Sequence, residues 1–121
     1  MPAFYITEDV QPDGPVVLAV SGEIDFEVSP RLSDCIDGHI KAGHVRLMLD
    51  LSEASFIDST AIGVLAGAAM RLRKSSDGSL VLVCNVENRK IMRIFEIAGL
   101  ESTVDVYHSR EEAFADLAAA C

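Results

Sequence analysis

Three consecutive polar residues, Asp58, Ser59 and Thr60, have the clearest capacity for chemistry in this chain of 121 residues. They follow the apolar pair Phe56-Ile57 and precede a helical apolar pattern. All three residue types favour the start of a helix, so one interpretation is that they only cap that helix. A second interpretation is that a kinase phosphorylates Ser59, because a phosphate placed there meets free backbone N–H groups at the positive end of the helix dipole.

Phosphorylation at Ser59 would act as a switch. The phosphate would leave the fold intact and change the surface by about −1.5 to −2 charges. A partner packed against Ser59 would then lose on the order of 2–5 kcal/mol of binding free energy, because an unpaired charge buried at an interface is costly. The second interpretation therefore predicts that phosphorylation would release a partner that contacts Ser59, whereas the first leaves Ser59 as part of a helix cap alone.

Motifs of catalysis and cofactor binding are absent from the sequence. It contains no GxxxxGK(S/T) phosphate loop, no GxGxxG fingerprint and no HExxH pair. Ser59 resembles the serine of a nucleophile elbow only superficially, since Ile57 and Ala61 stand where that elbow has glycines. None of the three histidines stands in the context of a catalytic triad: His39, His44 and His108. We therefore expect no enzyme activity and no cofactor.

The charge balance argues against nucleic acid as a partner. The chain carries 19 acidic and 10 basic residues, a net charge of −9, and has no basic stripe. Its densest cationic run, Arg71 to Lys74, falls at the predicted end of a helix, where cations favour the helix dipole. Direct binding of DNA or RNA is therefore not expected.

The cysteines are widely separated and form no CxxC pair: Cys35, Cys84 and Cys121. We expect the first two to be small core residues and the last a thiol at a frayed terminus. A zinc site would need more ligands at tighter spacing, so no metal site is predicted. Residues 1–9 do not form a signal peptide, and the longest apolar run, Ala61 to Met70, is too short to span a bilayer. These features predict a cytoplasmic protein without a membrane span.

The elements that must position these residues alternate along the chain. Five strands are predicted from apolar runs at residues 4–6, 16–22, 45–51, 80–84 and 103–107. Four helices are predicted: one capped by Ser29 and ended by Gly43, one from the Asp58 segment to Leu72, one from Ile91 to Gly99, and one opened by a Ser109–Glu112 capping box. The polar segment from Ser52 to Ser55 is predicted to be a bend.

This order predicts an α/β fold with one mixed, mostly parallel sheet shielded by about four helices. Strands that alternate with helices imply right-handed crossovers and parallel pairing, while a turn at residues 12–15 makes the first two strands a hairpin. Sites in such sheets gather where the carboxyl ends of strands lead into helix N-termini, and residues 57–60 occupy such a place.

The segment from Leu49 to Gly63 resembles the signature of STAS domains, a family that includes the bacterial anti-sigma factor antagonists. Residues 20–25 are similar to the second-strand signature of that family. Residues 94–100, followed by 104–107, are similar to its third helix and last strand. The resemblance covers nearly the whole chain and implies a single STAS domain over residues 1–121.

The resemblance implies a partner-switching pathway that regulates transcription, as in stress responses. In that family the serine at the position of Ser59 is phosphorylated by the cognate anti-sigma factor, a serine kinase that itself binds ATP. The unphosphorylated antagonist binds this kinase and frees a sigma factor, the phosphorylated form lets go, and a serine phosphatase resets it. Asp58 matches the aspartate of the motif, Asp25 an acidic position near the phosphorylation site, and Thr60 the adjacent hydroxyl.

Three further residues have two interpretations each. Ala61 stands where the family usually has glycine; alanine is better in a helical first turn by up to about 1 kcal/mol, and its methyl would also hinder a partner that approaches the backbone closely. Gly63 serves either the partner contact or only packing. Asp25 either takes part in the site or only caps the loop after the second strand.

Two rival functions remain open from the sequence. A constitutive STAS scaffold subunit of a stress-signalling or lipid-transport complex would use Ser59 only as a helix cap, and would elute within a large particle or a tight complex. A small-molecule sensor would bind a nucleotide, although the sequence offers no phosphate loop for one. A titration with GTP or ATP would detect that activity.

Overall fold

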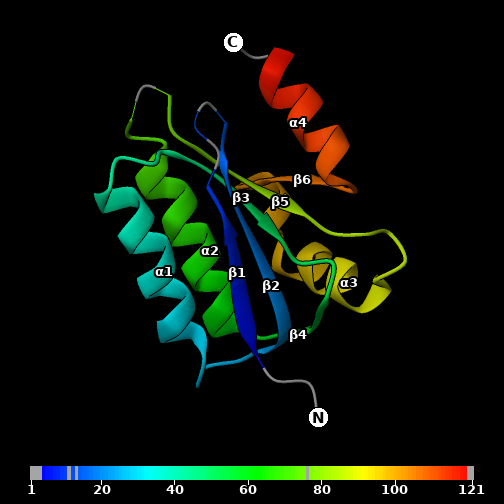
Figure 1. Ribbon diagram of the computed structural model, residues 1–121. Helices are drawn as coiled ribbons and strands as arrows, with labels where there is room; N and C mark the ends of the chain where they lie inside the picture. Colours follow the sequence, from blue (N-terminus) through cyan, green and yellow to red (C-terminus); the bar gives the residue numbers. More distant parts are fainter. Residues whose placement is uncertain (1–3, 11, 13, 76, 120–121) are drawn as a thin grey trace.

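Strands and helices alternate along the chain in the computed structural model (Figure 1), which describes residues 4–10, 12, 14–75 and 77–119, the last three by their backbone alone. The strands are β1 (Tyr5–Asp9), β2 (Val16–Ile24), β3 (Arg46–Asp50), β4 (Ala54–Ile57), β5 (Ser79–Val83) and β6 (Asp105–Tyr107). The helices are α1 (Ser29–Lys41), α2 (Ser59–Leu72), α3 (Arg89–Ala98), the short 3₁₀ helix η1 (Leu100–Ser102) and α4 (Arg110–Ala119).

The strands form one mixed sheet in the order β1-β2-β3-β5-β6, with β4 paired to β2. β1 runs antiparallel to β2, and all other pairs are parallel. The predicted α/β fold, with a mostly parallel sheet and four helices, is confirmed. No helix in the described part of the chain has the length and apolar character needed to cross a membrane.

Strand β4 replaces part of the bend that was predicted for residues 52–55. Ala54 and Ile57 are buried while Ser55 is exposed, so these four residues show no two-residue alternation from which a strand could be predicted. β3 and β4 lie one after the other along the same edge of β2, which pairs with β3 through its first half and with β4 through its last residues. The register shifts at Gly22, whose φ of 92° suits glycine.

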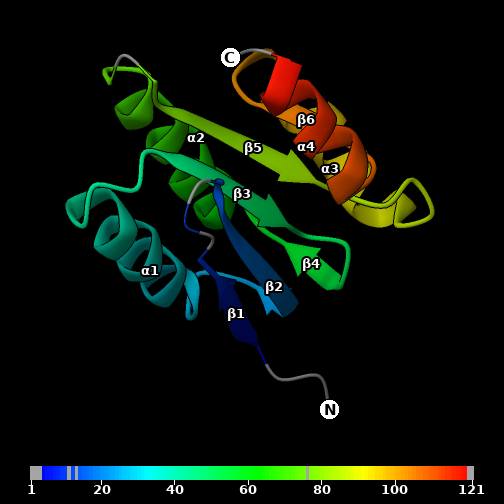
Figure 2. The same cartoon turned by 45° about the horizontal axis from the view of Figure 1, so that its top comes forward.

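Side chains alternate between the two faces of the sheet and build two cores. On one face, Leu18, Leu49 and Leu82 are neighbours in register and fully buried beneath the helices α1, α2 and α3. On the other face, Val17 and Met48 belong to a smaller core with Ala113 of α4. Figures 1 and 2 show α1 and α2 side by side, with α4 away from them. α1 and the sheet therefore hold α2 in place, and with it the α2 N-terminus.

The helix ends follow the predicted signals with one exception. Gly99 ends α3 in the left-handed region, with a φ of 67°. The Ser109 hydroxyl accepts a hydrogen bond from the Glu112 N–H at 3.1 Å, as a capping box predicts. The prediction that Ser29 caps α1 is wrong, because this serine is the first residue of the helix and is buried. Its hydroxyl instead donates to the Asp25 carbonyl at 2.8 Å.

Candidate functional site

The junction of β4 and α2 places the polar residues at one end of the sheet. Ile24 and Ile57 pair at the carboxyl ends of the parallel strands β2 and β4. The Asp58 N–H donates to the Ile24 carbonyl at 3.2 Å and so extends this ladder by one bond. Asp25 and Asp58 each follow one of the paired isoleucines, so the structure brings these two predicted site residues to the same edge.

Asp58 is the N-cap of α2. Its backbone is extended, with a φ of −105°, and its carboxylate accepts the Ala61 N–H at 3.0 Å. Its carbonyl accepts the Ile62 N–H at 3.0 Å, the first bond of the helical ladder. The capping interpretation of Asp58 is therefore confirmed, and it fixes Ser59 as the first residue of the helix.

Ser59 and Thr60 are exposed in the first turn of α2. Within the described part of the chain, no hydrogen bond engages either hydroxyl. The first N–H groups of a helix have no partner within the helix, and the Asp58 carboxylate takes only that of Ala61. A phosphate on Ser59 can therefore meet open N–H groups without breaking a contact of the serine hydroxyl.

Asp25 organises the loop between β2 and α1. Its carboxylate accepts the N–H groups of Glu27 at 3.0 Å and Val28 at 3.3 Å. Its carbonyl accepts the N–H of Ser29 at 2.9 Å in addition to the serine hydroxyl. The interpretation of Asp25 as a loop cap is confirmed, and the cap keeps the loop beside the α2 N-terminus. Phe26, at the tip of this loop, is 66% exposed.

Ala61 lies in the first turn of α2 with its side chain fully buried in the main core. No residue other than glycine in the described ranges has a positive φ, so alanine is compatible with the backbone here. The methyl group faces the core and not the solvent. It therefore does not obstruct a partner that docks on the outer face of α2, contrary to what the sequence suggested.

An exposed stripe of residues at helical spacing runs along α2 from the site: Thr60, Gly63, Gly67 and Met70. A Cβ atom added at either glycine would meet nothing within 4 Å. The stripe borders a groove of about 170 Å³ between α1 and α2, lined by residues of both helices: Ser33, Ile36, Asp37, Gly63, Val64, Gly67, Ala68 and Arg71. Gly67 was not predicted as a site residue, although its spacing of four from Gly63 marks the same face.

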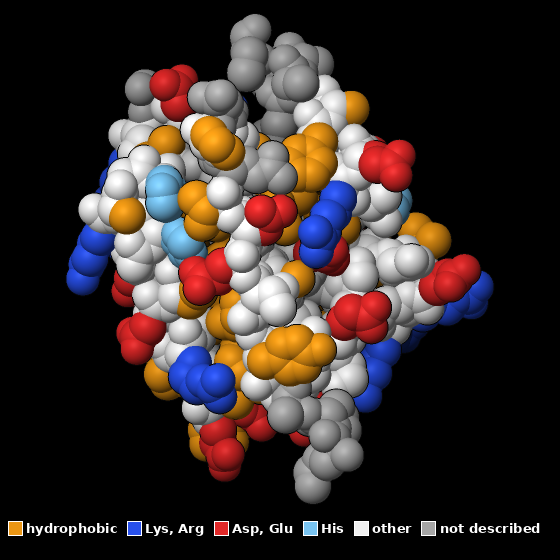
Figure 3. Space-filling view, viewed as in Figure 1, with side chains coloured by type: hydrophobic (Ala, Val, Ile, Leu, Met, Phe, Trp, Pro, Cys, Tyr) orange, Lys and Arg blue, Asp and Glu red, His pale blue; other side chains and the backbone are white. Residues whose placement is uncertain are grey.

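Acidic side chains surround the site. Glu23 is exposed on β2 opposite Phe56, Glu27 is exposed in the Asp25 loop, and Glu53 is exposed where β3 leads into β4. On the side of the molecule seen in Figure 3, where β1 lies at the front, acidic and basic side chains are interspersed and form no basic stripe. The three glutamates, with Asp25 and Asp58, outnumber the one cation that contacts this edge among the described residues, Lys90, which lies 5.7 Å from the centre of the Phe56 ring.

The break between β3 and β4, which brings β4 to the site, is held by Asp50. Its carboxylate accepts the Ser52 N–H at 3.0 Å and the Arg110 Nε–H at 2.7 Å. Burial alone would raise the pKa of Asp50, but the hydrogen bonds from Arg110 and Ser52 outweigh burial and hold this pKa below its ordinary value. The Asn88 amide covers the free edge of β4 by donating to the Ala54 carbonyl at 2.8 Å.

Comparisons with known proteins agree with this geometry. A family model described as STAS domain matches residues 6–113. A relative from Listeria monocytogenes named "Anti-sigma-B factor antagonist" is 35% identical over 88 residues, 72% of this chain and 74% of that protein. An anti-sigma factor antagonist from Mycobacterium paratuberculosis has a similar solved structure, with a TM-score of 0.85 and 24% identity over 95% of this chain and 94% of that one. The Bacillus protein SpoIIAA, solved in a phosphorylated form, has a TM-score of 0.66 and 22% identity over 93% of this chain and 99% of that one.

Proposed function

The chain belongs to the STAS domain family, and on this premise we propose that it is an anti-sigma factor antagonist. It binds an anti-sigma factor serine kinase in the cytoplasm and is released when Ser59 is phosphorylated. The chain itself supplies no catalysis in this scheme. The kinase partner binds the ATP, and a serine phosphatase restores the free hydroxyl.

The observation that carries the proposal is the exposed Ser59 hydroxyl at the capped N-terminus of α2. Asp58 and the β2–β4 pairing fix the helix start, so the serine is presented on a rigid element. A kinase can reach the hydroxyl without local unfolding, and phosphate at a helix N-terminus is electrostatically favourable. The fold therefore supports a modification that changes the surface and leaves the domain intact.

The stripe along α2 supports a partner contact that includes Ser59. Gly63 and Gly67 leave the helix backbone open to close approach, and the groove beside them exposes apolar atoms of Val64. A phosphate at the head of this stripe adds negative charge to an edge that is already acidic. Burying it without a basic counter-group opposes binding by the amount that a switch needs.

The known relatives support the same proposal. The Listeria relative is named as an antagonist of an anti-sigma factor, and SpoIIAA was solved in a phosphorylated form. This chain has the features that such a role needs: an exposed serine, a capping aspartate before it and an open helix face after it. Thr60 offers a second exposed hydroxyl beside the first.

The decisive experiment is phosphopeptide mapping of the protein purified from its own cells, combined with recovery of bound proteins. We expect a phosphate on Ser59, with Ser59→Ala retaining a serine kinase partner and Ser59→Asp losing it. Thr60→Ala is the matched control and should remain phosphorylated at Ser59. The proposal is wrong if Ser59 carries no phosphate under growth and stress, or if both Ser59 variants bind the kinase like the wild type. Recovery within a large constitutive particle would favour a scaffold subunit instead.

A further inference from the structure

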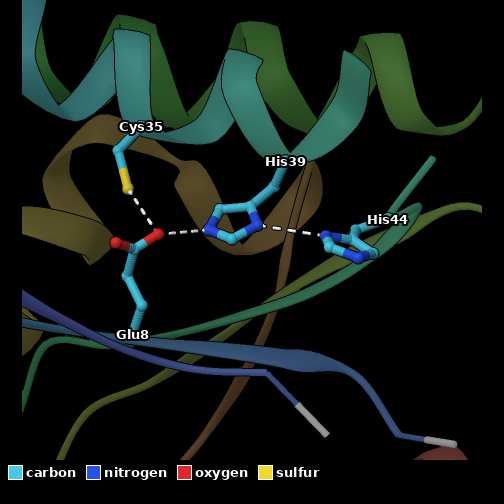
Figure 4. A network of polar contacts seen from close by, with 4 residues as sticks. All are labelled: Glu8, Cys35, His39 and His44. Atoms are coloured by element: carbon cyan, nitrogen blue, oxygen red, sulfur yellow. Dashed lines mark hydrogen bonds and ion pairs between the residues drawn. The ribbon is translucent and has the colours of Figure 1, made fainter. Parts of the chain in front are cut away.

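A second group of reactive side chains lies away from Ser59, between the edge strand β1 and helix α1 (Figure 4). Cys35 and His39 are one turn apart on α1, so their side chains leave the same face of the helix. Glu8 reaches toward both of them from β1. The three ligand atoms, a thiol sulfur, a ring nitrogen and a carboxylate oxygen, lie within 4.8 Å of one another.

The spacing of these atoms suits a metal ion. The Glu8 Oε1 atom lies 2.5 Å from His39 Nε2 and 3.6 Å from Cys35 Sγ. Ligands of a tetrahedral zinc ion, bound at about 2.0–2.3 Å, are separated from one another by roughly 3.3–3.8 Å. The Glu8–His39 contact must open by about 1 Å, and the Cys35 and His39 atoms, which lie within 4.8 Å of each other, must take up the same separation. The glutamate side chain is half exposed, which leaves it room to adjust.

The donor set points to zinc and not to a harder ion. Thiolate and imidazole ligands suit zinc, whereas magnesium and calcium prefer oxygen ligands alone. Three protein ligands leave a fourth tetrahedral position for water. Two ligands at positions i and i+4 of a helix are a common way to place metal-binding side chains on one face.

His44 supplies the support that a metal-bound histidine needs. Its Nδ1 atom lies 3.1 Å from His39 Nδ1, on the side of the ring that faces away from Glu8. With His39 bound to a metal through Nε2, its Nδ1–H donates to His44, which fixes the tautomer and the orientation of the His39 ring. The His39 side chain is only 12% exposed, so its ring is already held in place.

From this geometry we propose that Glu8, Cys35 and His39 form a zinc site, with His44 as the positioning residue behind His39. When the ion binds, the Cys35 thiol gives its proton to water. Exchange with water moves the proton of the Glu8–His39 hydrogen bond from His39 Nε2 to Nδ1, and His44 carries its own proton on Nε2, so that two metal–ligand bonds replace that hydrogen bond. The ion would fasten β1 to α1, alongside the contact of Arg31 with the Phe4 ring at 4.9 Å. Histidine side chains reach the surface on the face that carries β1, which gives the ion a path (Figure 3).

Spacing along the chain predicted no metal site, because Glu8 lies far in sequence from the other two proposed ligands. Glu8 precedes Cys35 by 27 residues, and a glutamate on a short strand has no distinctive context. Cysteine binds zinc as the thiolate, so zinc binding releases the Cys35 thiol proton, which calorimetry in two buffers can count.

The test is titration of zinc chloride and cobalt chloride into the full-length protein, produced without an affinity tag and freed of metal. We expect one zinc ion per chain and, with cobalt, the near-ultraviolet charge-transfer absorption of a bound thiolate. Cys35→Ser should abolish this absorption, and His39→Gln and Glu8→Gln should weaken zinc binding at least about tenfold. His44→Gln should weaken it by about 10-fold to 100-fold, because the support of His39 is lost.

Matched controls separate the site from non-specific binding. His108→Gln and Glu53→Gln each remove the same type of group as a ligand at a described position outside the cluster, and both variants should bind zinc like the wild type. The proposal is overturned if the wild type shows no zinc binding and no thiolate absorption at millimolar metal. It is also overturned if the cluster variants bind as tightly as the controls. Should Cys35→Ser lose its circular dichroism spectrum, Glu8→Gln at the exposed side chain decides the question alone.

Discussion

The two ends of this molecule that carry reactive side chains are organised in opposite ways. At the α2 N-terminus, Asp58, Ser59 and Thr60 are consecutive, and the two hydroxyls are exposed and make no hydrogen bond among the described residues. Between β1 and α1, Glu8, Cys35 and His39 come from separate segments and contact one another directly. The first arrangement leaves its hydroxyls accessible from outside, and the second brings three side chains into contact with one another.

The two arrangements suit different ligands, the first a protein and the second a metal ion. A kinase or a docking partner needs a rigid, accessible surface, which a capped helix with a glycine stripe provides. An ion needs several ligand atoms already within a few ångströms, which only tertiary structure can supply. Each of the following predictions tests one side of this contrast, from the largest expected effect to the smallest.

The largest effect is expected from a negative charge at Ser59. Ser59→Asp should weaken binding of the anti-sigma factor by on the order of 2–5 kcal/mol, about 30-fold to several thousand-fold, because the charge is buried in the interface without a counter-group. Folding stability should change little, since the residue is exposed at a helix N-terminus. Isothermal titration measures the first quantity and urea unfolding the second.

Ser55→Asp is the control for this charge. Ser55 is also exposed and lies four residues before Ser59, on β4 and outside the α2 stripe. The Ser55→Asp variant should bind the partner with an affinity close to that of the wild type. Equal losses for both variants would mean that general repulsion, and not a contact at Ser59, drives release.

Removal of the helix cap should cost about 1 kcal/mol of folding free energy. Asp58→Ala leaves the Ala61 N–H without its side-chain partner, whereas Asp58→Asn keeps an oxygen acceptor in the same place. The urea midpoint of the alanine variant should therefore fall, and that of the asparagine variant should lie close to the wild type. If alanine were neutral, the cap would not be what fixes the position of Ser59.

Gly63→Ala should raise the folding stability and lower the affinity for the partner. The added Cβ meets nothing within 4 Å, and alanine is the better helix former, so folding stability should rise by up to about 1 kcal/mol. Affinity for the partner should fall, because the methyl group stands in the surface that the partner approaches. Gly67→Ala, one turn further along the same stripe, should show the same stability gain. Unchanged affinity in both variants would rule out docking along this stripe.

The Asp50 carboxylate should make the folding stability depend on pH in the acid range. The pKa of Asp50 in the folded protein lies below the ordinary value of 3.8. The ionised carboxylate therefore contributes its full share of folding stability above that pH, and this share is lost as the pH falls through the folded pKa. Asp50→Asn should therefore show a shallower loss of stability than the wild type between about pH 5 and pH 2. Urea unfolding over this range measures both slopes, and parallel curves would contradict the assignment.

The smallest effect expected is the coupling between the two regions. Saturating zinc should change the affinity for the anti-sigma factor by less than about twofold, because the two sites share no contacting residues. Ser59→Asp should likewise leave zinc binding unchanged. A double-mutant comparison with Cys35→Ser measures the coupling, and a large value would show that α1 transmits between the regions.

Local sequence was sufficient for the features that depend on neighbouring residues. The Asp58 cap, the Gly99 helix end and the Ser109–Glu112 bond each involve groups within a few positions, and all were predicted. The alternation of strands and helices predicted the mostly parallel sheet for the same reason. The location of Ser59 at a strand-to-helix junction followed from that order.

Features that depend on distant segments were not accessible from the sequence. β4 forms because β2 extends past β3 and offers free pairing groups, although its first two residues, Ala54 and Ser55, were predicted to belong to a polar bend. Ser29 was expected to cap α1, but its hydroxyl donates to the Asp25 carbonyl because the loop before α1 folds back on itself. The Glu8 contact with His39 requires the edge strand to lie against α1, which no local pattern reveals.

The break between β3 and β4 also has a consequence for the divergence of duplicated genes. β3 holds the centre of the sheet through β2 and β5, while β4 leads into Ser59 and pairs with β2 among the described strands. Substitutions at Phe56, the partly buried β4 residue opposite Glu23, therefore change the surface of this edge without disturbing the central ladder. Copies of one gene can acquire separate partners on a common scaffold, and several such pathways can then operate in the same cell without cross-talk.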